Sequence, residues 1–451
     1  MKQTAPAVTP APYSFFNGGA LLDFEESVKY ITEYPRFKKI PSLDGIKSLL
    51  SALGNPESRI KTINVAGTNG KGSTVAMLAS VLNTAGYKTG RYVSPYVLEF
   101  RERMMINGKM IGRKRLAKIM STVREHAETL RENGTVLNAF EITTAAALLW
   151  FAEEQCDIVV LEAGIGGRFD ATNAVPEPTL QIITSVGLDH TAQLGSTVEE
   201  IAAEKCGIMR RGCTLLTCPN QNPKAKAVMI NKCAELEATF VMGSAGRGKI
   251  AAQSAEGTDI LVGKTELSIP FGGEHQINNA LTVVSAVDIL REKGFAITDE
   301  QLIEGIAAAK FPARFEVCSK EPLVILDGAH NPQAAAALAA GVEKFLPKKR
   351  TLLCGMMADK DCAAVMSILA PLFEHIITVP IQSPRAISPR ELAALAEPYC
   401  DDVSFAKSAP EALENALSAL QPNEALVVAG SLYLASELRP QLMRFKGKSE
   451  I

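Results

Sequence analysis

The sequence predicts an α/β fold of two domains, each built on a mostly parallel β-sheet. The chain has 451 residues, which is too long for one ordinary hydrophobic core. Several short apolar runs end in Gly, Asp or Glu and are followed by apolar residues at helical spacing. One of these runs leads into a loop with three glycines and a lysine, which is typical of a phosphate-binding site.

Five of the apolar runs are expected to be buried strands. Continuous apolar strands that alternate with helices indicate a parallel sheet covered on both faces. The polar residues just beyond such strands line the ligand crevice of the fold, and here they are Lys71, Glu162, His190 and Asp327. The five runs are Asp157–Leu161, Leu180–Val186, Leu323–Leu326, Thr351–Cys354 and Leu426–Ala429.

The glycine-rich loop lies between an apolar run and an expected helix. Its glycines let backbone N–H groups approach an anion, Lys71 adds a positive charge, and the helix presents its positive end. The loop departs from the standard pattern, because only two residues separate Gly67 from Gly70 and Gly72 follows the lysine where Ser or Thr is usual. A structural turn without a ligand is the alternative, but the lysine and the helix behind it favour a phosphate site.

The boundary between the domains is expected near residues 309–317, where Phe311–Arg314 separates one series of strand–helix units from the next. The first domain, residues 1–313, is then of the P-loop ATPase type. The second, residues 314–451, is a smaller, Rossmann-like α/β domain. Residues 240–275 are rich in Gly, Ser and Thr and contain short β-prone pieces, so a small antiparallel extension is expected there.

The composition argues against several classes of function. Hydrophobic residues make up 47% of the chain, charged residues 21%, and the formal net charge is −2. These values are typical of a soluble globular protein and give no reason to expect a nucleic-acid or membrane partner. No signal-peptide pattern and no apolar stretch of membrane-spanning length are found. The nine cysteines form no C-x-x-C pair, which favours reduced thiols and a cytoplasmic location.

Three histidines, His190, His275 and His330, stand in polar clusters near expected strand ends and are candidates for function. His126 and His375 are instead expected to be surface or core residues. Residue type alone predicts that Lys205 is a solvated helix lysine.

Glu162 follows a buried strand in the same domain as the phosphate loop. This arrangement holds Mg²⁺ in phosphoryl-transfer proteins. The alternative is a carboxylate that caps the Gly164–Gly167 turn. Arg168 and Asp170 could contact a charged substrate or pair with each other.

A series of short motifs occurs in order along nearly the whole chain. The motifs are Gly67–Ser73, Ser94–Tyr96, Phe100–Arg103, Phe140-Glu141, Leu161–Asn173, Leu188–Gly195, Glu204–Ile208, His275–Ala280, Arg314-Phe315, Asp327–Pro332, Asp359–Asp361 and Gly430–Leu434. Their order and spacing resemble those of the Mur ligase superfamily, and the glycine after Lys71 is the form found in folylpolyglutamate synthases and dihydrofolate synthases.

The resemblance implies roles for individual residues. ATP would be bound by Asn69, Gly70, Lys71, Gly72, Ser73, Asn279, Arg314 and Asp327. Two Mg²⁺ ions would be held by Ser94, Glu162, His190 and Lys205, the last as a carbamate formed with CO₂. Lys71, Lys205 and His330 would act in catalysis, with His330 near the transferred phosphoryl group. A pterin-side pocket would include Phe140, Glu141, Arg168, Phe169 and Asp170.

The implied reaction is ATP-dependent amide formation through an acyl phosphate. The enzyme would join L-glutamate to dihydropteroate and then extend the γ-glutamyl tail of reduced folates, as a monomer acting on small molecules. A folylpolyglutamate synthase without the first activity, a P-loop kinase or NTPase, and a non-catalytic binding protein are the alternatives. Two motifs depart from the family: Ala313 replaces a usual glycine, where a positive φ would be strained, and Tyr96 replaces a usual histidine.

Overall fold

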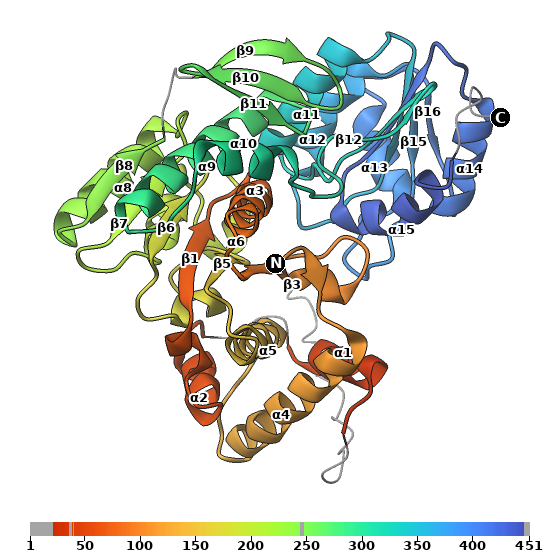
Figure 1. The fold of residues 1–451 in the computed structure, drawn as a ribbon. Helices are drawn as coiled ribbons and strands as arrows, with labels where there is room; N and C mark the ends of the chain where they lie inside the picture. Colours follow the sequence, from red (N-terminus) through yellow and green to blue (C-terminus); the bar gives the residue numbers. More distant parts are fainter. Residues whose placement is uncertain (1–20, 36–37, 39, 244–247, 446–451) are drawn as a thin grey trace.

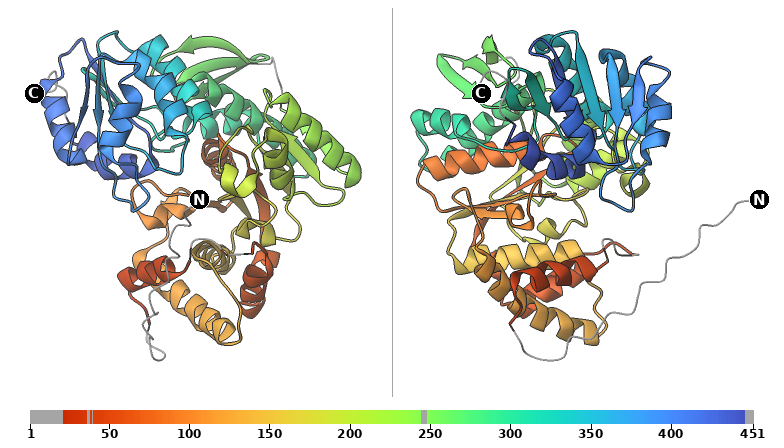
Figure 2. Two further views of the ribbon diagram at one scale, coloured as in Figure 1. Left: turned by 180° about the vertical axis from the view of Figure 1, so that it is seen from behind. Right: turned by 90° about the vertical axis from the view of Figure 1, so that its right-hand side faces the viewer.

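The structure is a computed structural model, and it describes residues 21–35, 38, 40–243 and 248–445. Figure 1 shows a group of helices at one end of the molecule, a large sheet next to it, and a second sheet domain beside the first. Figure 2 shows the same division from behind and from the side.

The first domain is built on an eight-stranded sheet with the order β4-β3-β2-β5-β1-β6-β7-β8. The strands from β2 to β8 in this order are parallel, and β3 and β4 extend the β2 edge antiparallel. The mostly parallel sheet is therefore confirmed. The strands are β1 Lys61–Ala66, β2 Thr89–Tyr92, β3 Met104–Ile106, β4 Lys109–Met110, β5 Ile158–Glu162, β6 Leu180–Ile183, β7 Thr214–Thr217 and β8 Thr239–Met242.

Helices cover both faces of this sheet. Alternate side chains of a strand point to opposite faces, so Ile158 and Val160 of β5 join the core under α3, α9 and α10, whereas Val159 and Leu161 join the core under α1, α2, α4 and α5. The helices are α1 Phe24–Glu33, α2 Asp44–Ala52, α3 Lys71–Thr84, α4 Arg113–Glu132, α5 Ala139–Glu153, α6 Thr191–Leu194, α7 Val198–Cys206, α8 Pro223–Glu235, α9 Glu274–Glu292 and α10 Asp299–Ala307, with 3₁₀ turns η1 Pro56–Arg59, η2 Phe100–Arg103 and η3 Ala171–Ala174.

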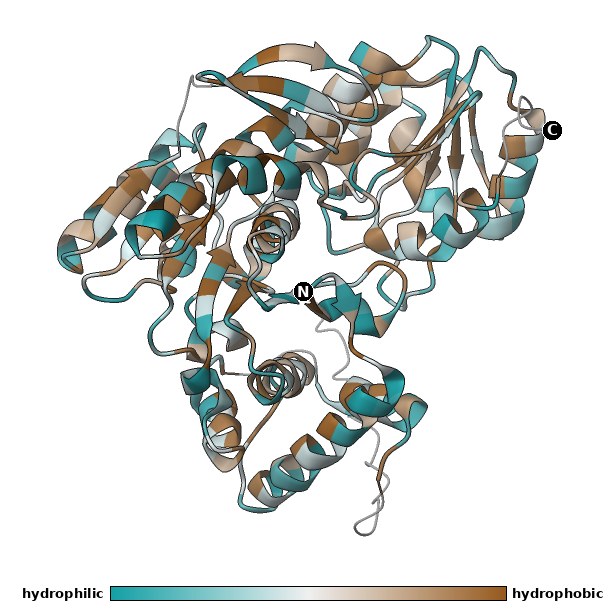
Figure 3. Ribbon diagram, viewed as in Figure 1, coloured by the Kyte–Doolittle hydropathy of each residue, from teal (hydrophilic) through white to brown (hydrophobic). Residues whose placement is uncertain are grey.

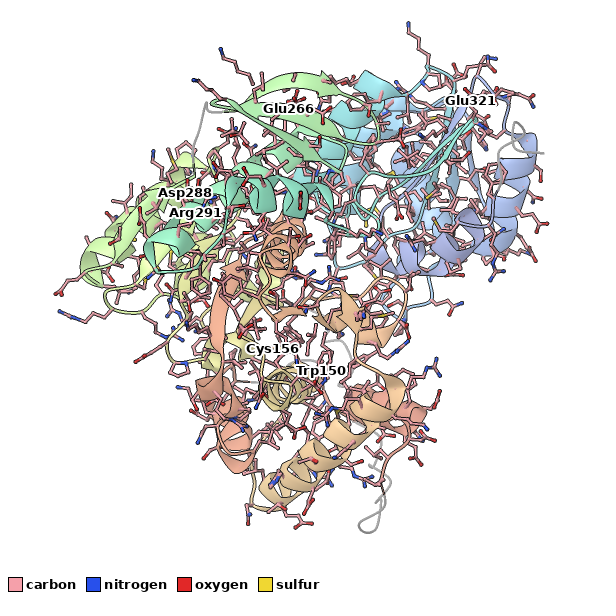
Figure 4. The ribbon with its side chains drawn as sticks, viewed as in Figure 1. Trp150, Cys156, Glu266, Asp288, Arg291 and Glu321 are labelled. Atoms are coloured by element: carbon pink, nitrogen blue, oxygen red, sulfur yellow. The ribbon has the colours of Figure 1, made fainter. Side chains whose placement is uncertain are left out.

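The helical layer of α1, α2, α4 and α5 was not anticipated from the sequence. It forms the lower end of the molecule in Figure 1. The single tryptophan of the chain, Trp150, is buried in α5 within this layer, and Cys156 follows just beyond the same helix (Figure 4). The layer encloses one face of β2 and β5 in a hydrophobic core.

The antiparallel extension expected in residues 240–275 is confirmed. It is a three-stranded sheet of β9 Gly248–Gln253, β10 Thr258–Val262 and β11 Thr265–Ile269. Ile260, Leu267 and Ile269 pack into the core that contains α9 and α10.

The second domain has a six-stranded sheet with the order β12-β13-β17-β14-β15-β16, parallel except for β12. Helices α11, α12 and α13 pack on one face, and α14 and α15 pack on the other. Figure 3 shows hydrophobic residues concentrated in its strands. The elements are β12 Glu316–Lys320, β13 Leu323–Leu326, α11 Pro332–Phe345, β14 Arg350–Cys354, α12 Cys362–Leu369, η4 Ala370–Leu372, β15 His375–Thr378, α13 Pro389–Ala396, β16 Val403–Phe405, α14 Ala409–Ala419, β17 Ala425–Ala429 and α15 Leu432–Leu442.

One expected strand ends earlier than predicted. Leu180–Val186 was expected to be a strand, but β6 ends at Ile183 because the following residues turn to hold the phosphate loop. The Ser185 carbonyl accepts the N–H groups of Thr68 and Asn69, and the Thr184 hydroxyl donates to the Asn69 carbonyl. Among the described residues, no helix is long and apolar enough to cross a membrane. All nine cysteines are unpaired.

Candidate active site

The phosphate loop connects β1 to α3. Gly70, at the N-cap of α3, has φ 85°, and a Cβ there would lie 2.3 Å from the Asn279 side-chain oxygen. Glycine is therefore required both by conformation and by space. The Lys71 ammonium donates to the carbonyls of Gly67 and Thr68, each at 3.1 Å. Burial lowers the pKa of Lys71, while the negative charges of Glu162 and Asp189 oppose this shift.

The structure explains why a glycine follows the lysine. A Cβ at Gly72 would lie 2.4 Å from a ring carbon of Phe311, so Ser or Thr, which the standard phosphate loop has here, would require this ring to move. The Arg314 guanidinium lies 5.2 Å from the centre of the same ring. The segment that joins the domains is thus packed directly against the phosphate loop.

A cavity of about 290 Å³ lies between the two domains, next to the phosphate loop. Both halves of the chain contribute to its wall, and the structure brings most of the predicted site residues together there. Those that line it are Asn69, Gly70, Lys71, Gly72, Ser73, Ser94, Glu162, His190, Lys205, Asn279, Arg314, Asp327 and His330. The chemical roles assigned to them stay predictions.

Glu162 is the last residue of β5 and is 5% exposed. One of its carboxylate oxygens accepts the Ser94 backbone N–H at 3.1 Å. Burial raises the pKa of Glu162, and Lys71 and the Ser94 N–H oppose this rise. The turn that Glu162 was alternatively expected to cap is held by Asp170 instead, whose carboxylate accepts the N–H groups of Gly164 and Ile165 at 2.8 and 3.1 Å.

The prediction that Lys205 is solvated is wrong. The residue is 3% exposed, and its ammonium donates to the Gly67 carbonyl at 2.8 Å. Burial, followed by the nearby charge of Lys71, lowers the pKa of Lys205 to about 7. The buried face of α7 includes Ile201, Lys205 and Cys206. The four-residue spacing from Ile201 to Lys205 could have predicted that this lysine is buried.

A buried carboxylate, Asp189, joins the two domains at the edge of the cavity. The Lys360 ammonium, which comes from the second domain, donates to it at 2.6 Å, and both side chains are nearly buried. The Nε2 atoms of His330 and His190 lie 3.8 and 4.0 Å from the same carboxylate. Burial alone would raise the pKa of Asp189, but the neighbouring His190 and the Lys360 ammonium hold it well below its usual range.

Both of these histidines are held neutral. Burial lowers the pKa of His190 to about 4, and Asp189 opposes this shift. Burial and then Lys360 lower the pKa of His330 to about 4. Lys360 belongs to the Asp359–Asp361 motif, but its pairing with Asp189 was not predicted from the sequence.

The phosphate loop also contacts the second domain directly. The Asn69 side-chain amide donates to the side-chain oxygens of Asn331 and Gln333 at 3.3 and 2.9 Å, and the Asn331 amide donates back to Asn69 at 3.1 Å. Gln333 further donates to the Ser185 hydroxyl at 2.6 Å. These contacts were not predicted from the sequence.

Asp327 follows β13, and its carboxylate binds the backbone at the beginning of the second domain. Its two oxygens accept the N–H groups of Phe315 and Ala329, each at 2.7 Å. Burial raises the pKa of Asp327, and Arg314 opposes this rise. Ala313 has φ 55° and is fully buried, so the strained positive φ that the missing glycine suggested is present.

Comparison with known proteins identifies the family. Residues 65–287 match the family model of the Mur ligase middle domain, and residues 313–432 match that of the Mur ligase glutamate ligase domain. The folylpolyglutamate synthase of Lacticaseibacillus casei is 34% identical over 432 residues, which cover 94% of this chain and 99% of that protein. The chain belongs to the folylpolyglutamate synthase and dihydrofolate synthase family of Mur ligases.

Other relatives extend this match. The dihydrofolate synthase/folylpolyglutamate synthase of Escherichia coli is 33% identical over 402 residues, which cover 88% of this chain and 90% of that protein. Among solved structures, Mycobacterium tuberculosis folylpolyglutamate synthase complexed with ADP aligns with a TM-score of 0.85 at 27% identity, covering 94% of this chain and 98% of that one. Escherichia coli FolC in complex with DHPP and ADP aligns with a TM-score of 0.82 at 26% identity, covering 93% and 97%.

The residues of this family member partly suit magnesium. Among the described residues, no group of three or more His, Cys, Asp and Glu side chains could hold a metal ion. The cavity does contain the buried Glu162 carboxylate and Ser94, and Mg²⁺ commonly takes one or two carboxylates and completes its shell with substrate phosphates and water. An uncharged or cationic Lys205 does not suit a cation, whereas a carbamate on the same nitrogen would.

The five residues predicted for a pterin-side pocket do not line the cavity. The Glu141 carboxylate accepts the Lys38 ammonium at 2.5 Å and the Ile46 N–H at 3.2 Å, and it completes the capping box of α5. Arg168 pairs with Glu204 at 3.3 Å rather than with Asp170. Phe140 lies behind the cavity wall, since a Cβ on Gly164 would meet its ring at 2.9 Å, and Phe169 is 48% exposed. Their substrate roles stay predictions.

Proposed function

We propose that the protein is an ATP-dependent ligase that joins L-glutamate to the carboxylate of dihydropteroate and of reduced folates. The observation that carries the proposal is the cavity between the domains, where the phosphate loop of the first domain faces the Asp327–His330 segment of the second. The relatives named above are folylpolyglutamate and dihydrofolate synthases over nearly their full lengths. ATP bound on the loop would place its γ-phosphate in this cavity.

The reaction has two chemical steps. A carboxylate oxygen of the pterin substrate attacks the γ-phosphorus of ATP, and ADP leaves with the electrons of the broken P–O bond. The glutamate amine then attacks the carbonyl carbon of the acyl phosphate, loses a proton and expels phosphate. Lys71 and Arg314, which line the cavity, would neutralise charge on the transferred group, and no side-chain nucleophile is needed.

Mg²⁺ held by Ser94 and Glu162 would supply further screening of the phosphate charge. The acyl phosphate is easily hydrolysed, so water must be excluded while it exists. The cavity has walls from both domains, and the contacts of Asp189 with Lys360 and of Asn69 with Asn331 bring these walls together. Closure of the domains over the substrates is therefore part of the proposed mechanism.

We further propose that Lys205 reacts with CO₂ to form a carbamate, and that this anion with His190 holds a second Mg²⁺. Carbamate formation needs a neutral amine, and burial lowers the pKa of Lys205 to about 7. A ¹³C resonance from ¹³C-bicarbonate should appear in the wild type and be absent in Lys205→Ala. Lys205→Ala should lose nearly all activity, and Lys205→Glu should keep part of it, whereas an alanine variant at full rate would refute the proposal.

The test of the main proposal is ligation by the purified protein with ATP, Mg²⁺ and L-glutamate. Dihydropteroate, tetrahydrofolate and no pterin are compared, and products are identified by mass. A gain of one glutamate on both pterins would establish both activities, and a gain on tetrahydrofolate alone would reduce the protein to a folylpolyglutamate synthase. Phosphate release without a mass gain would favour an NTPase instead. The cytoplasmic location and the monomeric state also stay proposals.

A further inference from the structure

Arg103, at the end of η2, has a guanidinium group without a protein acceptor. Its carbon Cζ lies 5.2 Å from the centre of the Tyr96 ring and 5.6 Å from that of Phe100. The Nε atom is buried and has no hydrogen-bond partner. In the described part of the chain, no ion pair or hydrogen bond involves this side chain. A half-buried guanidinium without a hydrogen-bond acceptor raises the free energy of the folded protein unless a ligand supplies the acceptor.

The nearby carboxylates are already occupied. Glu102 accepts the backbone N–H groups of Val97 and Leu98 at 2.8 and 3.1 Å. Glu99 binds Arg101 with two hydrogen bonds of 3.0 and 2.6 Å. Arg103 is thus the member of this turn left without a counter-ion, and a guanidinium fits a carboxylate through two parallel hydrogen bonds.

Arg103 lies next to the wall of the cavity. Its carbonyl accepts the Val93 N–H at 2.9 Å, and the next residue, Ser94, lines the cavity. Tyr92 and Phe140 form a ring pair with centres 5.9 Å apart, and Phe140 lies against Gly164 of the cavity wall. A guanidinium next to two aromatic rings suits a ligand that has both an aromatic ring and a carboxylate.

We propose that Arg103 binds the carboxylate of the folate that does not react. The inference rests on the proposed ligase function and concerns its two substrates. Dihydropteroate has a single carboxylate, which must reach ATP. A folate ends in glutamate, whose γ-carboxylate reacts while its α-carboxylate needs a separate binding site. Arg103 would therefore serve folate elongation and leave dihydropteroate ligation largely unaffected.

The test is the Arg103→Gln variant assayed with both substrates. Loss of a charge-assisted bond should raise KM for tetrahydrofolate about 10- to 100-fold. KM for dihydropteroate should stay within about twofold, because that substrate offers no second carboxylate. Arg103→Lys keeps the charge but not the paired donors, so it should show the same selectivity with a smaller increase. It also serves as the test if the glutamine variant does not fold.

The matched control is Arg113→Gln, because Arg113 also stacks on an aromatic ring, with Cζ 4.5 Å from the centre of Phe24, but pairs with the exposed Glu25. This control should leave both KM values unchanged. Equal increases for both substrates, or no increase for either, would overturn the assignment of Arg103. Should the wild type ligate neither substrate, the proposed function fails. Equilibrium binding of folate and of pteroate then tests Arg103 separately, since Arg103→Gln should weaken the binding of folate and leave that of pteroate unchanged.

Discussion

The buried ion pair between Lys38 and Glu141 allows a quantitative test of what Glu141 does. Lys38 lies in the segment before α2, Glu141 lies in the first turn of α5, and their side chains are 7% and 4% exposed. Glu141→Gln keeps one oxygen in place of two, and the N–H groups of Ile46 and Asn138 bind different oxygens of the carboxylate, so one of them loses its acceptor. The larger loss is at the Lys38 ammonium, which stays buried without its counter-ion.

Breaking a buried ion pair from one side costs about 3–5 kcal/mol. In a domain of 150–250 residues each kcal/mol lowers Tm by about 2–4 °C, so Glu141→Gln should lower Tm by about 6 °C or more. The control is Glu25→Gln, which removes the exposed pair of Glu25 with Arg113 and should cost less than about 1 kcal/mol. Thermal unfolding followed by circular dichroism measures both variants.

The same variants should be assayed for ligation. If Glu141 acts only through the fold, Glu141→Gln has a normal KM for pterin substrates at temperatures where it is folded. A variant as stable as the Glu25→Gln control, but with a KM for dihydropteroate raised tenfold, would refute the structural interpretation. That result would instead support the predicted role of Glu141 in a pterin-side pocket.

Three further predictions concern other parts of the molecule. Burial lowers the pKa of His275 to about 4, below its unfolded value of about 6.5, so the stability that neutral His275 contributes is present above pH 6.5 and lost as the pH falls towards 4. In the His275→Gln variant the free energy of unfolding, measured with urea, should depend less on pH between pH 4 and 6.5. Ala313→Val puts a β-branched residue at φ 55° in a packed core and should cost about 2 kcal/mol or more, whereas Ala313→Gly should be nearly neutral by the same measurement. Lys360→Met leaves Asp189 buried without its ammonium partner and should cost about 3 kcal/mol, with separate unfolding transitions for the two domains in calorimetry. A single unshifted transition would contradict the linking role.

Much of the sheet architecture could be predicted from the sequence. Leu323–Leu326 was predicted with the bounds that β13 has, because Pro322 and Asp327 delimit a run of four apolar residues that favours a buried strand. The run at Leu180 was predicted too long, because Thr184 and Ser185 leave the ladder to bind the phosphate loop. That contact joins residues more than a hundred positions apart, and local patterns do not contain it.

The site was predicted unevenly for a similar reason. Lys71 and Glu162 follow strands, and the carboxyl ends of parallel strands meet at one edge, so their convergence was foreseeable. Lys205 was predicted to be solvated because lysines usually are. Its position four residues after Ile201 puts it on the buried face of α7. The pairing of Lys360 with Asp189 depends on how two domains meet, which no pattern within either domain reveals.

The hydrogen bonds from Asn69 to Asn331 and Gln333 have a thermodynamic consequence for nucleotide affinity. One residue of the loop that would receive ATP is at the same time a contact between the domains. Occupancy of the loop and the relative position of the domains must then influence each other by equal free energies, since such coupling is reciprocal. By weakening this contact between the domains, Gln333→Ala in α11 should change the Kd for ATP through the coupling by at most the factor by which ATP changes the equilibrium between open and closed domains.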